Sequence, residues 1–248
     1  MAAKRCHPYL YWTEIIATTA RRRITLAQDK NDLEASRGNA MRAAQWMPLC
    51  LALIAAAPPV ANAADGPLGI DHRLRFDDSG IWKRRNQLLL QDAAALVVVG
   101  GALWEGDQTR LGHTYWQSVD SIVLGTAAAA VLKIAFSRAR PTQSDNPNDW
   151  FQGRGHNSFP SGEVAAITSA ITPFVLEYGA EHPFVYALEL LPLYDAIARM
   201  KVQAHWQSDV LAAFALGTAV GYYAHGRSSS LTVGLLPGGV TIGWHKKF

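Results

Sequence analysis

The chain is poor in cysteine: Cys6 and Cys50 are its only two among 248 residues. A disulfide framework needs several paired cysteines, and a thiolate metal site needs a cluster of them. The sequence therefore excludes both kinds of site for the part of the chain that follows Cys50.

Charged residues are also scarce, at 17% of the chain against 49% hydrophobic residues. Residues 1–63 hold eight of the 23 basic and four of the 20 acidic residues, so residues 64–248 carry 15 basic and 16 acidic residues, a net charge of −1. No basic stripe remains there, so we expect no nucleic-acid partner. The apolar balance favours a deeply buried helical core or a membrane protein.

An export signal is predicted over residues 41–63. Arg42 gives a short positive region, Met47–Ala57 forms an apolar stretch, and Ala61-Asn62-Ala63 is a small-x-small cleavage site. The alternative is a membrane anchor, but the eleven residues of the apolar stretch are few, because a span needs about 20. We expect an exported protein, either periplasmic or in the inner membrane with its active site facing the periplasm.

The chain divides into further segments by composition and period. Residues 1–40 show no period, and we interpret them as disordered or as lying upstream of a true start at Met41. A polar lead-in over 64–87 precedes a helical domain over 88–226. Over 227–248, alternating apolar residues flank a Pro-Gly-Gly turn, which predicts a small C-terminal β-hairpin.

The helical domain is predicted to be an all-α bundle of about five to six core helices with an active site at one end. Runs rich in alanine and glycine favour closely packed helices. The apolar segments are Leu88–Trp104, Gln117–Phe136, Val164–Tyr178, Phe184–Met200 and Val210–His225. A soluble bundle and an integral membrane protein both stay open, because the fourth segment contains Glu189, Pro192 and Asp195.

Two short motifs lie where apolar segments end or begin. Lys133 precedes Arg140 by seven residues, a spacing that puts both cations near one face of a helix ended by Pro141. In the stretch "NSFPSGEVAA", Ser161 and Gly162 form a turn before a predicted helix whose first turn carries Glu163. Unpaired N–H groups at such a helix start are suited to bind an anion.

A third motif holds a histidine beside a carboxylate. Arg199 precedes His205 by six residues, and Asp209 follows His205 by four, so on a helix the carboxylate could fix the imidazole tautomer. Taken singly, each motif also fits an ordinary helix cap or a surface pair. If the helices alternate in direction, all three motifs meet at one end of the bundle. Such a cluster describes a site for a tetrahedral oxyanion.

These motifs resemble the signature of the type 2 phosphatidic acid phosphatase superfamily, which also includes the vanadium haloperoxidases. The order and spacing agree over about residues 130–210 for Lys133-x6-Arg140-Pro141, Pro160-Ser161-Gly162 and Arg199-x5-His205-x3-Asp209. The resemblance implies that His205 attacks phosphorus and forms a phosphohistidine, that Asp209 orients it, and that neither metal nor cofactor is needed. The implied phosphate ligands are Lys133, Arg140, Arg199 and the backbone N–H groups of Ser161 and Gly162.

The sequence departs from the family pattern at Glu163, where a histidine usually stands and protonates the leaving oxygen, and at Ala198, where a serine is usual. We interpret Glu163 as a replacement general acid, which requires that it hold a proton at the working pH. His156 is a possible substitute for it.

The favoured function is hydrolysis of phosphomonoesters or diphosphates, on a lipid-linked or a small phosphoester substrate, at a membrane. Candidate substrates are phosphatidate, phosphatidylglycerol phosphate, undecaprenyl diphosphate and lipid A. One alternative is a vanadate-dependent haloperoxidase, because the same pocket could hold vanadate. The other is a catalytically decayed envelope protein, which the retention of the histidine, its carboxylate and all three cations argues against.

Overall fold

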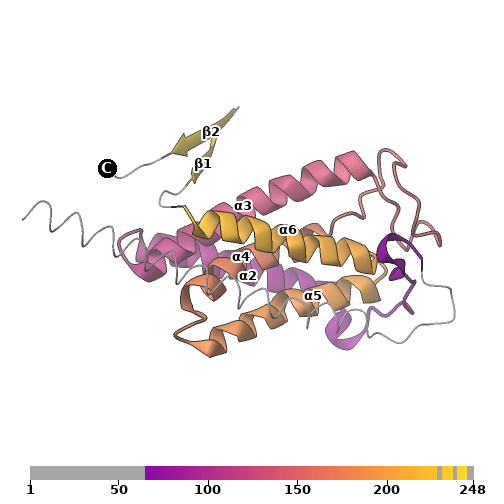
Figure 1. Cartoon of the computed structure of the whole chain (residues 1–248), viewed down its shortest axis with the longest axis horizontal. Coiled ribbons are helices and arrows are strands. Elements are labelled where there is room, and N and C mark those ends of the chain that lie inside the picture. Colours follow the sequence, from indigo (N-terminus) through magenta and orange to yellow (C-terminus); the bar gives the residue numbers. More distant parts are fainter. Residues whose placement is uncertain (1–64, 228–230, 237–238, 245–248) are drawn as a thin grey trace, which may run out of the picture. The chain divides into compact units, whose positions relative to one another are not determined.

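The computed structural model describes residues 65–227 and two strands, 231–236 and 239–244. The predicted signal peptide and the segment before it lie outside the described residues. The described chain is helical, as predicted, with α2 (Arg84–Glu105), α3 (Arg110–Phe136), α4 (Gly162–Tyr178), α5 (Leu190–Lys201) and α6 (Gln207–His225) (Figure 1). Three short 3-10 helices, η1 (Pro67–Gly69), η2 (Gly80–Trp82) and η3 (Pro183–Glu189), accompany them.

Helix ends follow local sequence signals. Gly106 has a φ of 68° and ends α2, a left-handed conformation that costs glycine least. Thr109 then caps α3 by accepting the Gly112 N–H at 2.9 Å. The predicted single helix over Phe184–Met200 is wrong: it divides into η3 and α5, because Pro192 cannot donate a backbone hydrogen bond to the preceding turn.

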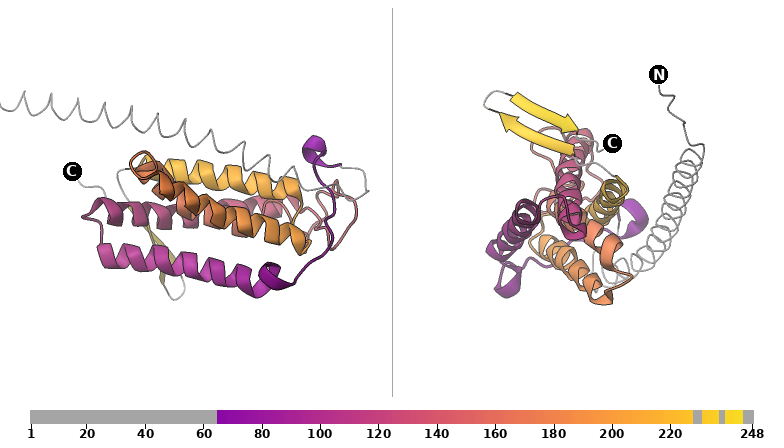
Figure 2. Two further views of the ribbon diagram at one scale, coloured as in Figure 1. Left: turned by 90° about the horizontal axis from the view of Figure 1, so that it is seen from below. Right: turned by 90° about the vertical axis from the view of Figure 1, so that its left-hand side faces the viewer.

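Helix α4 lies at the centre of the bundle, between α3 and α6 (Figure 2). Small residues allow the close approach: a Cβ added at Gly217 of α6 would lie 2.6 Å from the Cβ of Thr168, and one at Gly125 of α3 would lie 2.3 Å from Ser169 Oγ. Buried apolar side chains such as Val164 fill the rest of the core. The predicted packing through alanine and glycine is present here.

Helix α2 differs from α4 because most of its large apolar side chains face outward. Trp104 is 89% exposed, and the other exposed large side chains of this helix are Leu88, Leu89, Leu96, Val97, Val99 and Leu103. By length and composition α2 and α3 could each cross a membrane, although a buried helix of a soluble protein can meet the same criterion.

The C-terminal strands β1 (Leu231–Leu236) and β2 (Gly239–Trp244) pair antiparallel, with Val233 opposite Ile242. The turn residues 237–238 lie outside the described residues. The predicted C-terminal hairpin as a whole therefore stays a prediction.

Candidate active site

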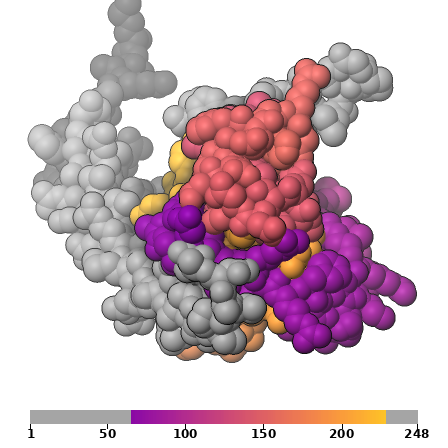
Figure 3. Space-filling model, turned by 90° about the vertical axis from the view of Figure 1, so that its right-hand side faces the viewer, coloured from indigo at the N-terminus to yellow at the C-terminus, as the bar shows by residue number. Residues whose placement is uncertain are grey.

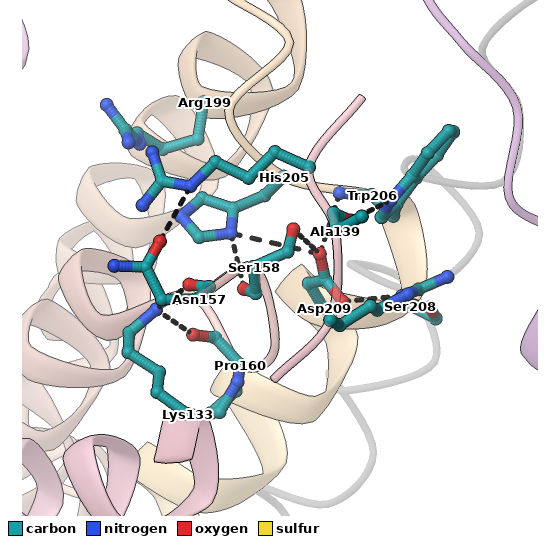
Figure 4. A network of polar contacts seen from close by, with 12 residues as sticks. Lys133, Ala139, Asn157, Ser158, Pro160, Arg199, His205, Trp206, Ser208 and Asp209 are labelled. Atoms are coloured by element: carbon teal, nitrogen blue, oxygen red, sulfur yellow. Dashed lines mark hydrogen bonds and ion pairs between the residues drawn. The ribbon is translucent and has the colours of Figure 1, made fainter. Parts of the chain in front are cut away.

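One end of the bundle gathers all three motifs. Here α3 and α5 end, α4 and α6 begin, and the loop over residues 137–161 lies beside the lead-in segment (Figure 3). Lys133 Nζ donates to the carbonyls of Asn157 and Pro160, both at 2.7 Å, and Arg140 Nε donates to Asn157 Oδ1 at 3.0 Å. His205 contacts the same loop (Figure 4). The predicted meeting of the motifs is therefore present in the structure.

Lys133 and Arg140 converge by a route that differs from the predicted one. Helix α3 ends at Phe136, and Ser137 has a left-handed φ of 38°, so Arg140 lies in the loop. The prediction that both cations share one helical face is wrong. The side chain and carbonyl of Asn157 bring them together instead, because each cation donates a hydrogen bond to this residue.

His205 lies in the turn before α6 and is 3% exposed. Its Nδ1 is 2.7 Å from the carbonyl oxygen of Ser158, which can only accept, so Nδ1 carries the proton. Asp209 Oδ2 lies 3.8 Å from the same nitrogen. The prediction that His205 and Asp209 share a helical face is wrong, but the tautomer is fixed all the same. It leaves the lone pair of Nε2 available for nucleophilic attack.

Burial lowers the pKa of His205 to about 4, and the positive charges of Lys133 and Arg199 act in the same direction, whereas Asp209 opposes the shift. The imidazole is therefore neutral near pH 7. A neutral imidazole is the form that can act as a nucleophile.

Asp209 is held by three donors at the start of α6. Its Oδ2 accepts the Trp206 N–H at 2.9 Å and the Ser158 hydroxyl at 2.5 Å, and Oδ1 accepts Arg138 Nη1 at 2.5 Å. Burial alone would raise the pKa of Asp209, but its interaction with His205, the charge of Arg138 and the hydrogen bond from Ser158 outweigh burial and lower the pKa. The carboxylate is ionised and oriented toward the imidazole.

Arg138 is a site residue that the sequence analysis missed. Its guanidinium is fully buried, bridges Asp209 and Asp71 of the lead-in segment, and lies 4.3 Å from the ring centroid of Trp150. Asp71 also accepts the backbone N–H of Ser208 at 2.8 Å. Asp71 precedes Arg138 by 67 residues, so no local pattern could have identified the pair.

Ser161 and Gly162 differ in what they can offer an anion. The Ser161 N–H donates to the Asp209 carbonyl at 3.2 Å, so the predicted use of this N–H for phosphate is wrong for the present arrangement. Ser161 precedes α4 without a side-chain cap, and its buried Oγ has no partner among the described residues. Gly162 begins α4, where the first-turn N–H groups have no intrahelical acceptor.

Glu163 is paired with arginines. Its two carboxylate oxygens accept Arg84 Nη1 at 2.5 Å and Nη2 at 2.7 Å, and Arg199 Nη2 lies 3.7 Å from Oε1. Burial favours a raised pKa, but the hydrogen bonds from Arg84 and the charge of Arg199 outweigh it, so the pKa of Glu163 is lowered. A general acid needs the opposite shift. The predicted role of Glu163 as a general acid is therefore not supported by its surroundings.

Two further possibilities at this site are His156 and a bound metal ion. His156 is half-buried in the loop next to Asn157, and its Nδ1 has no partner among the described residues. Within residues 65–227, no group of three or more histidine, cysteine, aspartate or glutamate side chains is arranged to hold a metal ion. The site thus consists of a neutral imidazole, an oriented carboxylate and several cations, a set that could bind a tetrahedral oxyanion and attack its centre.

The family model of the PAP2 superfamily matches residues 114–229. The lipid A 1-phosphatase of Porphyromonas gingivalis is 36% identical over 147 residues, which are 59% of this chain but only 25% of the relative. The chain thus spans about a quarter of the length of that relative. A crystal structure of Aquifex aeolicus LpxE aligns at a TM-score of 0.41 and 20% identity, over 57% of this chain and 86% of that one.

Proposed function

The chain belongs to the PAP2 superfamily, and from this premise we propose that it is a phosphatase that hydrolyses phosphomonoesters or diphosphates of lipids through a phosphohistidine. The observation that carries the proposal is the buried imidazole of His205, whose Nδ1 is bound to Ser158 while Nε2 keeps its lone pair. A nucleophile of this kind splits one difficult hydrolysis into two easier steps.

In the first step Nε2 of His205 attacks phosphorus, and the bond to the leaving oxygen breaks with its electron pair on that oxygen. The nearby carboxylate of Asp209 stabilises the positive charge that develops on the imidazole. In the second step a water molecule attacks phosphorus, the P–N bond breaks, and phosphate leaves.

Cations of the chain hold the transferred phosphoryl group in this proposal. Lys133 and Arg199 lie near enough to His205 for their charges to act on its imidazole, and Arg140 lies beside Lys133. All three supply charge-assisted hydrogen bonds to the non-bridging oxygens. The first-turn N–H groups of α4, which have no intrahelical acceptor, add neutral donors. The Ser161 hydroxyl, which has no partner within the part of the chain that the structure describes, can add another. Because these groups supply the electrophilic charge, we expect activity to persist in EDTA.

A lipid substrate is supported by the outward-facing apolar side chains of α2 and by the lipid A 1-phosphatase relative. We place the protein at a membrane with its site on the periplasmic side, after removal of residues 41–63. Extraction with carbonate as against detergent tests the membrane association, and sequencing of the mature N-terminus tests the cleavage.

The function is tested by phosphate release from phosphatidate, lipid A, farnesyl phosphates and p-nitrophenyl phosphate, with His205→Ala as the control. Quenching a reaction with ³²P-labelled substrate should trap protein-bound phosphate that is stable in alkali and labile in acid, as a phosphoramidate is. Phosphate release without this species, or release that survives His205→Ala, would contradict the mechanism.

A further inference from the structure

Arg84, the first residue of α2, extends the cationic site beyond the three predicted cations. It forms a two-pronged pair with Glu163 and also lies 3.0 Å from Gln87 Oε1. The Arg84 side chain is 39% exposed, so one side of it remains accessible to a ligand.

Arg84 and Arg199 lie beside the same two groups, Gln87 and Glu163. Arg199 Nη1 donates to Gln87 Oε1 at 3.1 Å, and Arg199 Nη2 lies 3.7 Å from Glu163 Oε1. Two guanidinium groups therefore flank one carboxylate and one amide oxygen. The Arg199 side chain is almost fully buried, and its Nε has no partner among the described residues. Arg84, Arg199 and Glu163 together carry one net positive charge. The carboxyl of Asp195 beside them, whose pKa is raised to about 7 by burial and by Glu163, offsets only part of that charge near neutral pH, so the cluster can still accept an anion.

Glu163 bears no proton near neutral pH, because its pairing with Arg84 lowers its pKa. A leaving alkoxide, which needs a proton, would receive none from this residue. A leaving group that departs as a stable anion needs only positive charge nearby, and Arg84 supplies that charge.

We propose that Arg84 binds the leaving group and stabilises it as an anion, and that the preferred substrates are therefore diphosphate esters, whose leaving group is itself a phosphate. The inference rests on the proposed function. Glu163 is a positioning residue in this scheme: it keeps the Arg84 guanidinium next to Arg199 while the transferred phosphoryl group occupies the pocket at His205.

The chemistry balances without a proton donor in the first step. Nε2 of His205 bonds to the terminal phosphorus, and the anhydride P–O bond breaks with its electron pair on the oxygen of the lipid monophosphate. Arg84 compensates the charge on that oxygen. Water then cleaves the phosphohistidine, its oxygen and protons leave with inorganic phosphate, and the imidazole regains its lone pair.

The test compares matched substrates on the full chain in detergent: farnesyl diphosphate, farnesyl monophosphate and p-nitrophenyl phosphate. The wild type should prefer the diphosphate over the monophosphate. Arg84→Gln should lower kcat/KM for the diphosphate by about 100-fold, the order seen when a donor to developing charge is removed. The loss on p-nitrophenyl phosphate should be smaller, because its phenolate leaving group spreads the charge over the ring and has no phosphate oxygens for a guanidinium to bind. Arg84→Lys, which keeps the charge, should recover part of the loss.

Arg85→Gln is the matched control, because it removes the same charge from the next, exposed residue of α2. An equal loss in Arg84→Gln and Arg85→Gln would overturn the proposal, as would an equal loss on the diphosphate and p-nitrophenyl phosphate. A loss in Glu163→Gln confined to farnesyl monophosphate would overturn it by showing that Glu163 donates a proton. An inert wild type would instead contradict the proposed function itself, and the inference with it.

Discussion

Arginine–carboxylate pairs occur at both ends of the bundle, but they are buried at one end and exposed at the other. At the end with the motifs, Arg138 is fully buried between Asp71 and Asp209. At the far end, Arg110 pairs with Glu177 and Glu181, and its side chain is 47% exposed. Water solvates the second group and not the first, so we expect the buried charges to control structure and chemistry and the exposed ones to contribute little.

The largest contrast should lie in catalysis. His205→Ala should lower kcat by at least about 10³-fold, because it removes the proposed nucleophile. His225→Ala removes a histidine that pairs with Glu177 at the far end and should leave kcat within about twofold of the wild type. Steady-state phosphate release measures both, and comparable losses would show that the two ends do not differ as described.

A matched pair of arginine substitutions should lower the free energy of unfolding by different amounts at the two ends of the bundle. Arg138→Met leaves two buried carboxylates without their cation and should lower the free energy of unfolding by about 3–5 kcal/mol. Arg110→Met should cost less than about 1 kcal/mol, because its pairs are exposed to solvent. Chemical denaturation followed by circular dichroism gives both values, and similar costs would refute the comparison.

Acid should destabilise the motif end through His205. The pKa of this residue is about 4 in the folded chain against an ordinary value of 6.5, because burial disfavours the charged form. The unfolded chain therefore binds the extra proton first, and the free energy of unfolding should fall by about 3 kcal/mol as the pH drops from 6.5 to 4. The free energy of unfolding of the His205→Gln variant should fall less than that of the wild type over the same pH range, by about 3 kcal/mol. An identical pH dependence in both proteins would exclude this residue as the cause.

The smallest effect concerns salt. A double-mutant cycle on Arg110 and Glu181 should give a small stabilising coupling at low ionic strength that falls toward zero in about 1 M NaCl, because exposed charges are screened. The coupling between Arg138 and Asp71 should keep most of its value in the same salt. Equal salt sensitivity would mean that water reaches both pairs.

The sequence predicted the helices well because their apolar runs are long and rich in alanine, and it predicted the cluster of motifs because alternating helices bring their ends together. The prediction failed where the interacting partner of a residue lies far away in the sequence. Arg84 and Glu163 are 79 residues apart, and nothing near Glu163 indicates a guanidinium that would hold it ionised.

Local conformation was the second source of error. The spacing of Lys133 and Arg140 fits a continuous helix, but the left-handed Ser137 ends α3 between them. Likewise, His205 and Asp209 are four residues apart, yet α6 begins only at Gln207, and Asp209 is engaged by the Trp206 N–H. In both cases the spacing identified the correct residues but predicted the wrong backbone conformation.

The lead-in segment and α2 have a consequence for how the protein can be dissected. A fragment that starts at α3 would keep His205 and every predicted motif. It would nevertheless leave Arg138 with a single carboxylate partner and deprive Arg199 of the Gln87 amide oxygen. A fragment meant to keep these contacts must therefore include Asp71 and α2, which lie well before the first signature residue.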